Sequence, residues 1–205
     1  MNRNQQLTFS SKAPDLTLFD TNGQPVFLSD FWKNRPLLLV FSRHFGCTQC
    51  KEMLQKFYAE KERINQAGLN LVIVLQGTIE ASAEFAAQFA PGIRCLADPE
   101  RKAYKAYGLQ RGNIFQTFLN IKVWRAIRES RKKGFKVEPP PAGQDSMQMS
   151  GIFIISREGK IELPYYFDHI ADHPAIDLLL HGVLFTRWDQ PFEGPIGQFA
   201  SKDQE

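Results

Sequence analysis

Hydrophobic residues in this chain occur as short, unbroken runs separated by longer stretches of mixed character. Runs of this length and residue type are typical of strands buried on both faces of a sheet. Such strands are predicted at residues 37–41, 69–75, 93–97 and 151–155, with an antiparallel partner at 161–166. A shorter hairpin is predicted before them, with strands at 15–19 and 25–28 around the Asn22-Gly23 turn.

Between these runs, apolar residues recur three or four positions apart, which indicates amphipathic helices. The predicted helices span residues 48–66, 79–89, 100–107, 112–133 and 175–185. Strand, helix and strand alternate in the first half of the chain, and a hairpin and a helix follow after residue 150. This order predicts an α/β fold in which a mixed central sheet carries helices on both faces.

The segment at residues 112–143 interrupts this alternation. Its apolar residues form one helical face: Ile114, Phe118, Ile121, Trp124 and Ile127. The other face is basic, and the prolines at 139–141 end regular structure. We therefore expect an inserted basic helix in a single domain, 1–205, with a core at about residues 13–185 and an irregular tail at 188–205.

Composition narrows the class of protein. Hydrophobic residues make up 43% of the chain and charged residues 23%, as in globular proteins. No apolar run approaches the roughly 18 residues of a membrane-spanning helix, and the amino terminus lacks the apolar core of a signal peptide. A net charge of +3 is too small to indicate nucleic-acid binding. Three cysteines form no disulfide scaffold, so we expect a reducing compartment, the cytoplasm.

A C-x-x-C motif follows the strand at 37–41, with Cys47 and Cys50 at the predicted start of a helix. The first N–H groups of a helix lack intrahelical partners and its dipole is positive there, so a thiolate at Cys47 would be stabilised. Cys50 lies one turn further on the same face, within reach of a disulfide. Arg43 and Lys51 add positive charge, which lowers a thiol pKa. The pattern predicts a redox-active pair.

Other interpretations of these residues stay open. The two cysteines could form half of a zinc site, but Cys95 is the one other cysteine, and only His44 could join it. They could also be two inert buried thiols. Cys95 lies in an apolar run, as small core residues do. His44 could donate a proton to a leaving oxygen or be an ordinary loop residue. No metal and no organic cofactor is implied.

Two further clusters are ambiguous. Asp168-His169 and Asp172-His173 have the side chains of metal ligands, but at a helix start such residues are ordinary caps. The segment from Lys122 to Lys136 carries many basic side chains against a lone Glu129. It could contact an anionic membrane surface or an acidic redox partner, or it could be a solvated face.

Three passages resemble one family of redox proteins. The sequences LADPER (96–101) and AYGL (106–109) resemble the peroxiredoxin segment that holds the catalytic arginine, and Arg101 falls at that arginine. Residues 151–160 resemble the strand and turn that follow it. The R-x-F-x-C-x-x-C loop at 43–50 is similar to that of the peroxiredoxin-like 2 group of the thioredoxin superfamily, which includes selenoprotein U relatives.

The resemblance implies a thioredoxin-like three-layer sandwich and a chemistry like that of alkyl hydroperoxide reductase and thiol-specific antioxidant proteins. It implies that Cys47 attacks a peroxide or disulfide, that Cys50 resolves the product, and that Arg101, with Arg43 as a second candidate, stabilises charge. Without the resemblance, Arg101 would be interpreted as an exposed helix charge.

The sequence also departs from the family pattern. Ordinary peroxiredoxins place a Pro and a peroxide-binding Thr or Ser ahead of the reactive cysteine. Here Val40 and His44 stand seven and three residues before Cys47. No Pro precedes Gly151, where thioredoxins carry their cis-proline. These departures weaken the expectation of fast peroxide reduction.

These observations predict a thiol-dependent enzyme with an antioxidant role, which reduces peroxides through Cys47 and Cys50. A thioredoxin or glutathione-type reductant would regenerate the pair. One alternative is a thiol-disulfide oxidoreductase without peroxidase activity. Another is a non-enzymatic redox sensor or binding module, in which the disulfide alters how the basic helix is presented to a partner.

Overall fold

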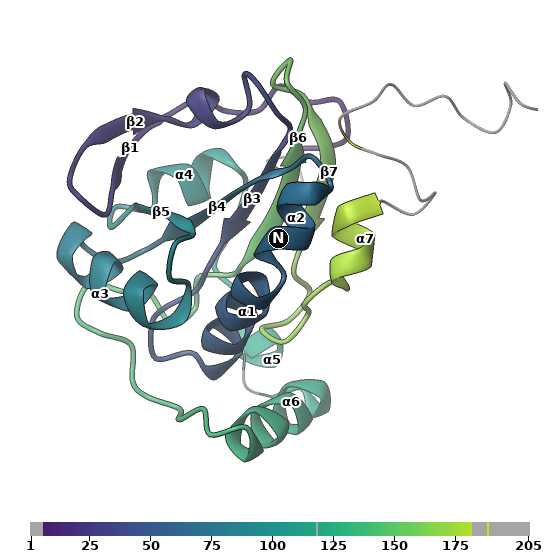
Figure 1. The fold of residues 1–205 in the computed structure, drawn as a ribbon. Helices are drawn as coiled ribbons and strands as arrows, with labels where there is room; N and C mark the ends of the chain where they lie inside the picture. The colour runs from purple at the N-terminus through teal and green to yellow at the C-terminus, as the bar shows by residue number, and fades with distance from the viewer. Residues whose placement is uncertain (1–5, 118, 182–187, 189–205) are drawn as a thin grey trace, which may run out of the picture.

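One mixed sheet organises the molecule (Figure 1), which is a computed structural model that describes residues 6–117, 119–181 and 188. Its seven strands lie in the order β2-β1-β5-β4-β3-β6-β7. Their bounds are β1 Thr17–Asp20, β2 Pro25–Phe27, β3 Leu37–Phe41, β4 Asn70–Leu75, β5 Arg94–Ala97, β6 Gly151–Ile155 and β7 Ile161–Tyr166. Strand β3 pairs in parallel with β4 and antiparallel with β6, so the predicted mixed sheet is confirmed.

Helices cover both faces of this sheet, as predicted. A 3-10 turn, η2, spans Leu28–Phe31. The α-helices are α1 Thr48–Ala59, α2 Lys61–Gln66, α3 Ile79–Phe89, α4 Lys102–Ala106, α5 Ile114–Thr117, α6 Ile121–Lys132 and α7 Ile176–His181. In Figure 1, α1, α2 and α7 lie in front of the sheet and α4 lies behind it. Within the described residues, no helix is both long enough and apolar enough to cross a membrane.

The central strand explains why the fold has two cores. Successive side chains of a strand point to opposite faces of the sheet. Leu38 and Val40 of β3 therefore pack with the apolar faces of α1, α2, α3 and α7. Leu37, Leu39 and Phe41 pack on the opposite face with α4 and η2. All five side chains are fully buried, which is why the run reads as unbroken hydrophobicity.

Two predicted long helices are each interrupted once. The helix expected at 48–66 breaks at Glu60, whose φ and ψ of −98° and 3° separate α1 from α2. The helix expected at 112–133 breaks before Asn120, which is extended and accepts the Lys122 N–H on its side chain at 2.9 Å. Each new segment starts with its own cap or turn, which overrides a continuous apolar pattern.

Other boundaries differ by a few residues. The helix expected from residue 100 begins at Lys102, because Arg101 adopts a left-handed conformation with a φ of 55°. Phe118, the predicted helical residues 182–185 and the tail at 188–205, except Trp188, lie outside the described residues. The Trp188 indole N–H donates to the Leu179 carbonyl oxygen at 2.8 Å.

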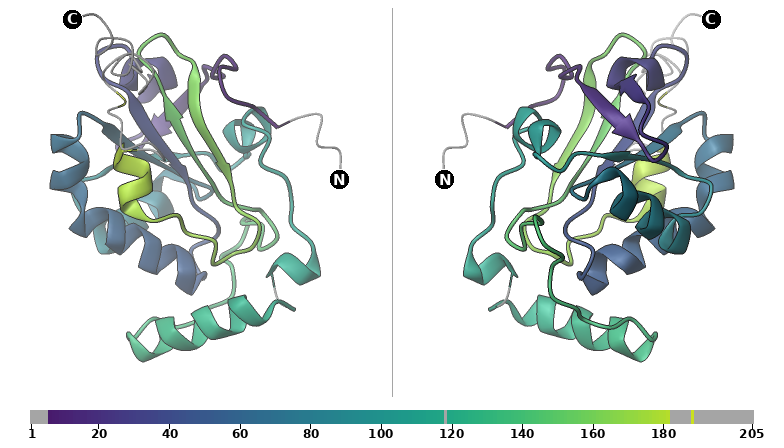
Figure 2. Two further views of the ribbon diagram at one scale, coloured as in Figure 1. Left: turned by 90° about the vertical axis from the view of Figure 1, so that its right-hand side faces the viewer. Right: turned by 90° about the vertical axis from the view of Figure 1, so that its left-hand side faces the viewer.

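The inserted basic helix, α6, lies beyond one end of the sheet, next to the start of α1 (Figures 1 and 2). The apolar face expected from Ile121 and Trp124 is not the face that it buries. Those two side chains are exposed, whereas Val123 and Ser130 are fully buried. Of the predicted apolar face, Ile127 packs against the core, and α1 offers polar partners to Ser130 on the same side of α6.

Candidate functional site

Cys47 lies where β3 passes into α1, at the carboxyl end of a strand that is parallel to β4. It is the N-cap residue of α1, with extended φ and ψ of −77° and 115°. Its N–H donates to the His44 carbonyl oxygen at 3.1 Å, and its own carbonyl accepts the Lys51 N–H at 3.1 Å. The sulfur therefore sits at the positive end of the helix, as the sequence predicted.

The two cysteines of the motif have opposite electrostatic surroundings. The thiol and the N–H of Cys50 both donate to the Cys47 sulfur, and together with the Arg43 guanidinium they outweigh burial and lower the pKa of Cys47 from 9.0 to about 6. Burial and the neighbouring sulfur raise the pKa of Cys50 well above its usual range. Both groups are thiols without a disulfide here. At neutral pH, one sulfur is therefore a thiolate and the other keeps its proton.

Arg43 supplies the charge beside the reactive sulfur. Its Nη1 lies 3.4 Å from the Cys47 sulfur, and its Nε donates to the Gln148 carbonyl oxygen at 3.0 Å. Its Nη2 donates to the carbonyl oxygen of Ser146. Because the side chain is only 2% exposed and anchored at three points, the guanidinium is held against the thiolate.

The linker between α6 and β6, residues 133–150, covers the loop that leads to Cys47. The Glu138 N–H donates to the Gly46 carbonyl oxygen at 3.1 Å, and the Glu138 carboxylate pairs with Lys51. The Gln144 side chain accepts the Phe45 N–H at 2.8 Å. A Cβ at Gly46 would overlap the backbone of Glu138, so glycine is required for this approach.

Helix α6 covers the start of α1 through side-chain hydrogen bonds. The Gln49 amide donates to the Ser130 hydroxyl at 2.8 Å, and that hydroxyl donates to the Glu52 carboxylate. Lys133 pairs with the other oxygen of Glu52. Together with the linker, α6 leaves the two cysteines of the motif 5% and 1% exposed.

The remaining residues predicted near the thiolate are His44 and Lys51. His44 is 8% exposed, and its Nδ1 has no hydrogen-bond partner among the described residues. Burial, and then the charges of Arg43 and Lys51, lower the pKa of His44 to about 4, so its imidazole is neutral at pH 7. Lys51 is occupied by Glu138 and lies 5.5 Å from the centroid of the Phe89 ring.

Arg101 lies apart from the sulfur atoms in this structure. Its Nη1 donates to the Gly143 carbonyl oxygen at 3.4 Å, and none of its recorded contacts within the described chain reaches Cys47 or Cys50. It lines a cavity of about 280 Å³ together with Asp145 and Gln148. Gln148 is also the residue whose carbonyl anchors Arg43, so the cavity adjoins the cysteine site through one residue.

Cys95 and the Asp-His cluster at 168–173 both have structural roles. Cys95 is 2% exposed in the core, where burial raises its pKa to about 12, so its interpretation as a small core residue is confirmed. The Asp172 carboxylate accepts the Asp168 N–H at 2.9 Å and the Tyr165 hydroxyl at 3.1 Å. It stabilises the turn before α7, not the first turn of the helix. Across the described part of the chain, no three His, Cys, Asp or Glu side chains converge as metal ligands.

Several residues that shape this site were not identified from the sequence. Gln148 and Ser146 hold Arg43 through backbone oxygens. Every residue has such an oxygen, so the residue type does not indicate the contact. Ser130 and Gln144 act through side chains, but they lie 81 and 99 residues from their partners. The one local signal was Gly46, whose missing side chain admits the linker.

Comparisons with known proteins show the family to which this chain belongs. The AhpC/TSA family matches residues 9–163. Thioredoxin-like protein AAED1, chloroplastic, of Arabidopsis thaliana is 29% identical over 170 residues, which cover 80% of this chain and 68% of that protein. Peroxiredoxin-like 2C of Homo sapiens is 28% identical over 186 residues, which cover 83% of this chain and 78% of that protein.

A solved structure agrees at the level of the fold. A yeast mitochondrial 1-Cys peroxiredoxin superposes with a TM-score of 0.62 at 12% identity, over 86% of this chain and 74% of that one. The family match extends from the first hairpin, through the cysteine helix and the segment of Arg101, to strand β7. The resemblance drawn from the sequence is thus confirmed, and this chain belongs to the AhpC/TSA family, with peroxiredoxin-like 2C among its relatives.

Proposed function

We propose that this protein reduces peroxides with Cys47 as the nucleophile and Cys50 as the resolving thiol. The observation that carries the proposal is the unequal pair of sulfurs. The Cys47 sulfur accepts hydrogen bonds from Arg43 and Cys50 and has a pKa of about 6, whereas the pKa of Cys50 is raised. A nucleophile that is ionised at neutral pH beside a protonated thiol is the arrangement that two-step thiol chemistry needs.

The reaction proceeds in two balanced steps. The Cys47 thiolate attacks one peroxide oxygen, so that an S–O bond forms and the O–O bond breaks; the departing alkoxide takes up a proton and leaves as an alcohol or water. Cys50 then attacks the sulfenic sulfur, which gives the Cys47–Cys50 disulfide and releases water. An external dithiol returns two electrons and two protons. The yeast 1-Cys peroxiredoxin is described as resolved through glutathione and thioredoxin systems, and we propose a reductant of that type here.

Three nearby residues receive supporting roles in this proposal. Arg43 stabilises the thiolate through its 3.4 Å contact. His44, neutral because its pKa is about 4, retains one ring N–H that can donate to the leaving oxygen. Arg101 borders the cavity next to Gln148, from which it can orient a bound peroxide.

Peroxide turnover by matched cysteine variants tests the proposal. The parent should consume hydrogen peroxide and an organic hydroperoxide with thioredoxin or with glutathione, and should lose two hydrogens within one peptide on oxidation. Cys47→Ser should lose turnover, whereas Cys50→Ser should accumulate a sulfenic acid that a dimedone probe traps. Cys95→Ser, in the core, is the control. A Cys47–Cys95 disulfide, or initial reaction at Cys50, would contradict these assignments.

A second candidate is a thiol-disulfide oxidoreductase without peroxidase activity. The observation that favours it is that this chain lacks both residues that ordinary peroxiredoxins place ahead of the nucleophile, the Pro at the position of Val40 and the peroxide-binding Thr or Ser at the position of His44. Val40 is fully buried in β3, and His44 takes the place of Thr or Ser. The rates of Cys47 oxidation by peroxide and by a small disulfide separate the two activities. If neither substrate turns over, while the pair still oxidises reversibly, the redox-sensor alternative is favoured.

A further inference from the structure

An apolar and basic surface on α5 and α6 is left uncovered by the fold. Five of the ten exposed large hydrophobic side chains of the described residues fall within residues 114–124. Each of these five is between 58% and 78% exposed: Ile114, Phe115, Leu119, Ile121 and Trp124. We call them, together with the exposed cations of α6, the α5–α6 surface. Such a concentration of apolar side chains on an otherwise polar exterior marks an interaction site.

The orientation of α6 explains this exposure. Val123 and Ser130 face the body of the protein, where Ser130 bonds to Gln49 and Glu52 of α1. In an α-helix, residues three or four apart share a face. Ile121 and Trp124 therefore lie on the side of α6 that points away from α1. Both views in Figure 2 place α6 at the extreme lower end of the molecule, where a flat surface can reach it.

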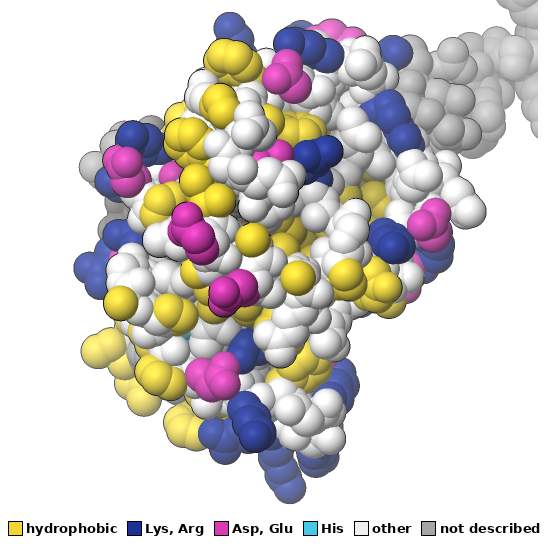
Figure 3. Space-filling model, turned by 60° about the vertical axis from the view of Figure 1, so that its left-hand side comes forward, with side chains coloured by type: hydrophobic (Ala, Val, Ile, Leu, Met, Phe, Trp, Pro, Cys, Tyr) yellow, Lys and Arg dark blue, Asp and Glu magenta, His cyan; other side chains and the backbone are white. Residues whose placement is uncertain are grey.

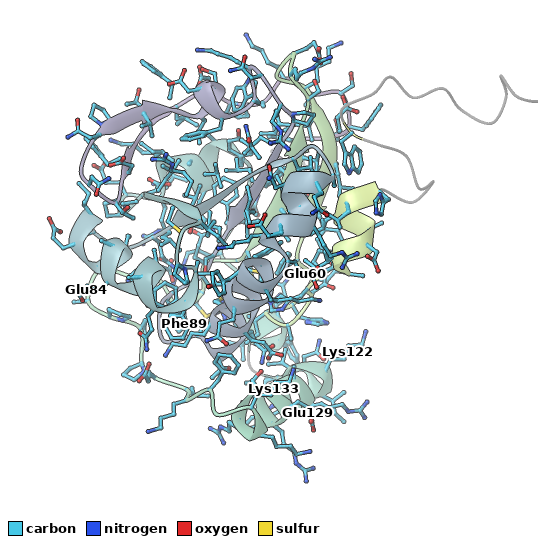
Figure 4. All side chains as sticks on the ribbon, in the orientation of Figure 1. Glu60, Glu84, Phe89, Lys122, Glu129 and Lys133 are labelled. Atoms are coloured by element: carbon cyan, nitrogen blue, oxygen red, sulfur yellow. The ribbon has the colours of Figure 1, made fainter. Side chains whose placement is uncertain are left out.

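The charges on α6 are largely unpaired. Within the described chain, five exposed cations of the helix and its linker form no ion pair: Lys122, Arg125, Arg128, Arg131 and Lys136. The one acid on the helix, Glu129, pairs with Lys132 at 2.8 Å. Figure 4 places Lys122, Glu129 and Lys133 along the helix, below α1. In Figure 3, Lys and Arg side chains gather with hydrophobic ones at this lower end.

We propose that the α5–α6 surface docks the protein on an anionic membrane surface. A helix that presents Trp and aliphatic side chains beside Arg and Lys is suited to the lipid interface, where the apolar groups enter the acyl boundary and the cations meet the headgroups. Trp124 in particular combines an apolar ring with an N–H that favours the headgroup region. A second copy of this chain would instead bring five unpaired cations against five more.

Docking would place the lipid next to the cysteine-bearing helix. Ser130 connects the inner face of α6 to Gln49 and Glu52, which flank Cys50 on α1. The membrane-facing side of α6 is therefore one helix diameter from the start of α1. The docking itself does not depend on the proposed peroxide chemistry, so binding is measured without turnover.

Sedimentation with vesicles tests this surface directly. The full chain is mixed with phosphatidylcholine vesicles and with vesicles that contain about 30% phosphatidylglycerol, a content sufficient for a strongly anionic surface. We expect binding to the anionic vesicles alone, a decrease with added salt, and a blue shift of tryptophan emission that Trp124→Phe removes. Because one basic side chain near an anionic surface contributes a factor of roughly five in binding, Arg125→Glu with Arg128→Glu should weaken it by about 25-fold or more.

Two further pairs of substitutions serve as a control and as a second test in the vesicle experiment. Arg157→Glu with Lys160→Glu makes the same change in net charge in the exposed turn between β6 and β7, at the other end of the sheet in Figure 1, and should retain most of the binding. Ile121→Ser with Trp124→Ser should lose binding while the far-ultraviolet circular dichroism is unchanged. Absence of vesicle binding, or equal binding to neutral vesicles, would overturn the proposal. So would a dimer in light scattering that the serine variant dissociates.

Discussion

Helices α1 and α6 are both twelve residues long, yet they are attached to the molecule in different ways. Helix α1 packs Met53, Leu54 and Phe57 into the core in front of the sheet. Helix α6 contributes one fully buried apolar side chain, Val123, and the partly buried Ile127, and it is also held by the hydrogen bonds of Ser130. Apolar burial thus fixes the helix that carries the cysteines. Fewer apolar contacts, together with polar contacts that contribute less net free energy, hold the helix that covers them.

The largest effect should follow from a change in the core face of α1. Leu54 is fully buried, so Leu54→Ala removes apolar contacts and leaves a cavity. We expect the free energy of unfolding to fall by about 2–5 kcal/mol in urea titrations. Gln55→Ala, an exposed neighbour on the same helix, is the control and should be nearly neutral. A loss below about 1 kcal/mol for Leu54→Ala would mean that burial does not fix α1.

The next effect concerns the charge that Arg43, in the loop between β3 and α1, places at the thiolate. Arg43→Met removes the guanidinium that lowers the pKa of Cys47, so that pKa should rise from about 6 by roughly one to two units. The thiolate fraction at pH 6 then falls, and the midpoint of the alkylation rate moves to higher pH. Arg101→Met should leave the midpoint in place, because Arg101 bonds to Gly143 and not to the sulfur. Equal shifts in both variants would contradict this division of roles.

A smaller effect should follow from loosening α6. Ser130→Ala removes the hydroxyl between Gln49 and Glu52 and leaves the Gln49 amide without that partner. The loss should be about 1–2 kcal/mol, seen as faster hydrogen exchange across α6 while α1 remains protected. Lys132→Ala, which breaks an exposed pair with Glu129, serves as the comparison and should cost less than about 0.5 kcal/mol. Equal exchange in α1 and α6 would show that the two helices open together.

The smallest effect is expected on the outer side of α6. Trp124→Ser changes a large side chain that is 63% exposed, so the free energy of unfolding should change by no more than about 0.5 kcal/mol. Thermal unfolding of the variant beside the parent measures this. Val123→Ser, one residue earlier and fully buried, should be clearly destabilising. If the two changes have equal cost, the assignment of inner and outer faces of α6 is wrong.

The same contrast explains which parts of the fold could be predicted from the sequence. Strands such as β3 are buried on both faces, so residue type alone identifies them. Arg43 lies four residues before Cys47, and their proximity follows from a strand that turns into a helix. For α6, the predicted apolar face contained Ile121, Trp124 and Ile127, but only Ile127 packs against the core. The residues of α1 that face α6 include polar ones, and they bond to Ser130. An apolar stripe indicates a helix without identifying what covers it.

The way in which the linker covers the cysteine site could not be predicted from the sequence, for a related reason. Gln144 and Gln148 act on residues about 100 positions earlier, and the second of them uses a backbone oxygen that any residue would supply. Arg101 was identified through a resemblance in its local segment. Its contact with Gly143 depends on where the linker lies, which no local pattern encodes.

The hydrogen bonds to the Cys47 sulfur also affect the energetics of its disulfide. A thiolate that is stabilised in the reduced protein has no counterpart in the oxidised one, so each such interaction favours reduction. With its pKa lowered from 9.0 to about 6, the Cys47 thiol is ionised at pH 7, so the reduced form is stabilised relative to the disulfide. The hydrogen bonds from Cys50 and the charge of Arg43 therefore make the Cys47–Cys50 disulfide easier for a dithiol to reduce, and the advantage grows as the pH rises from 6 towards 9.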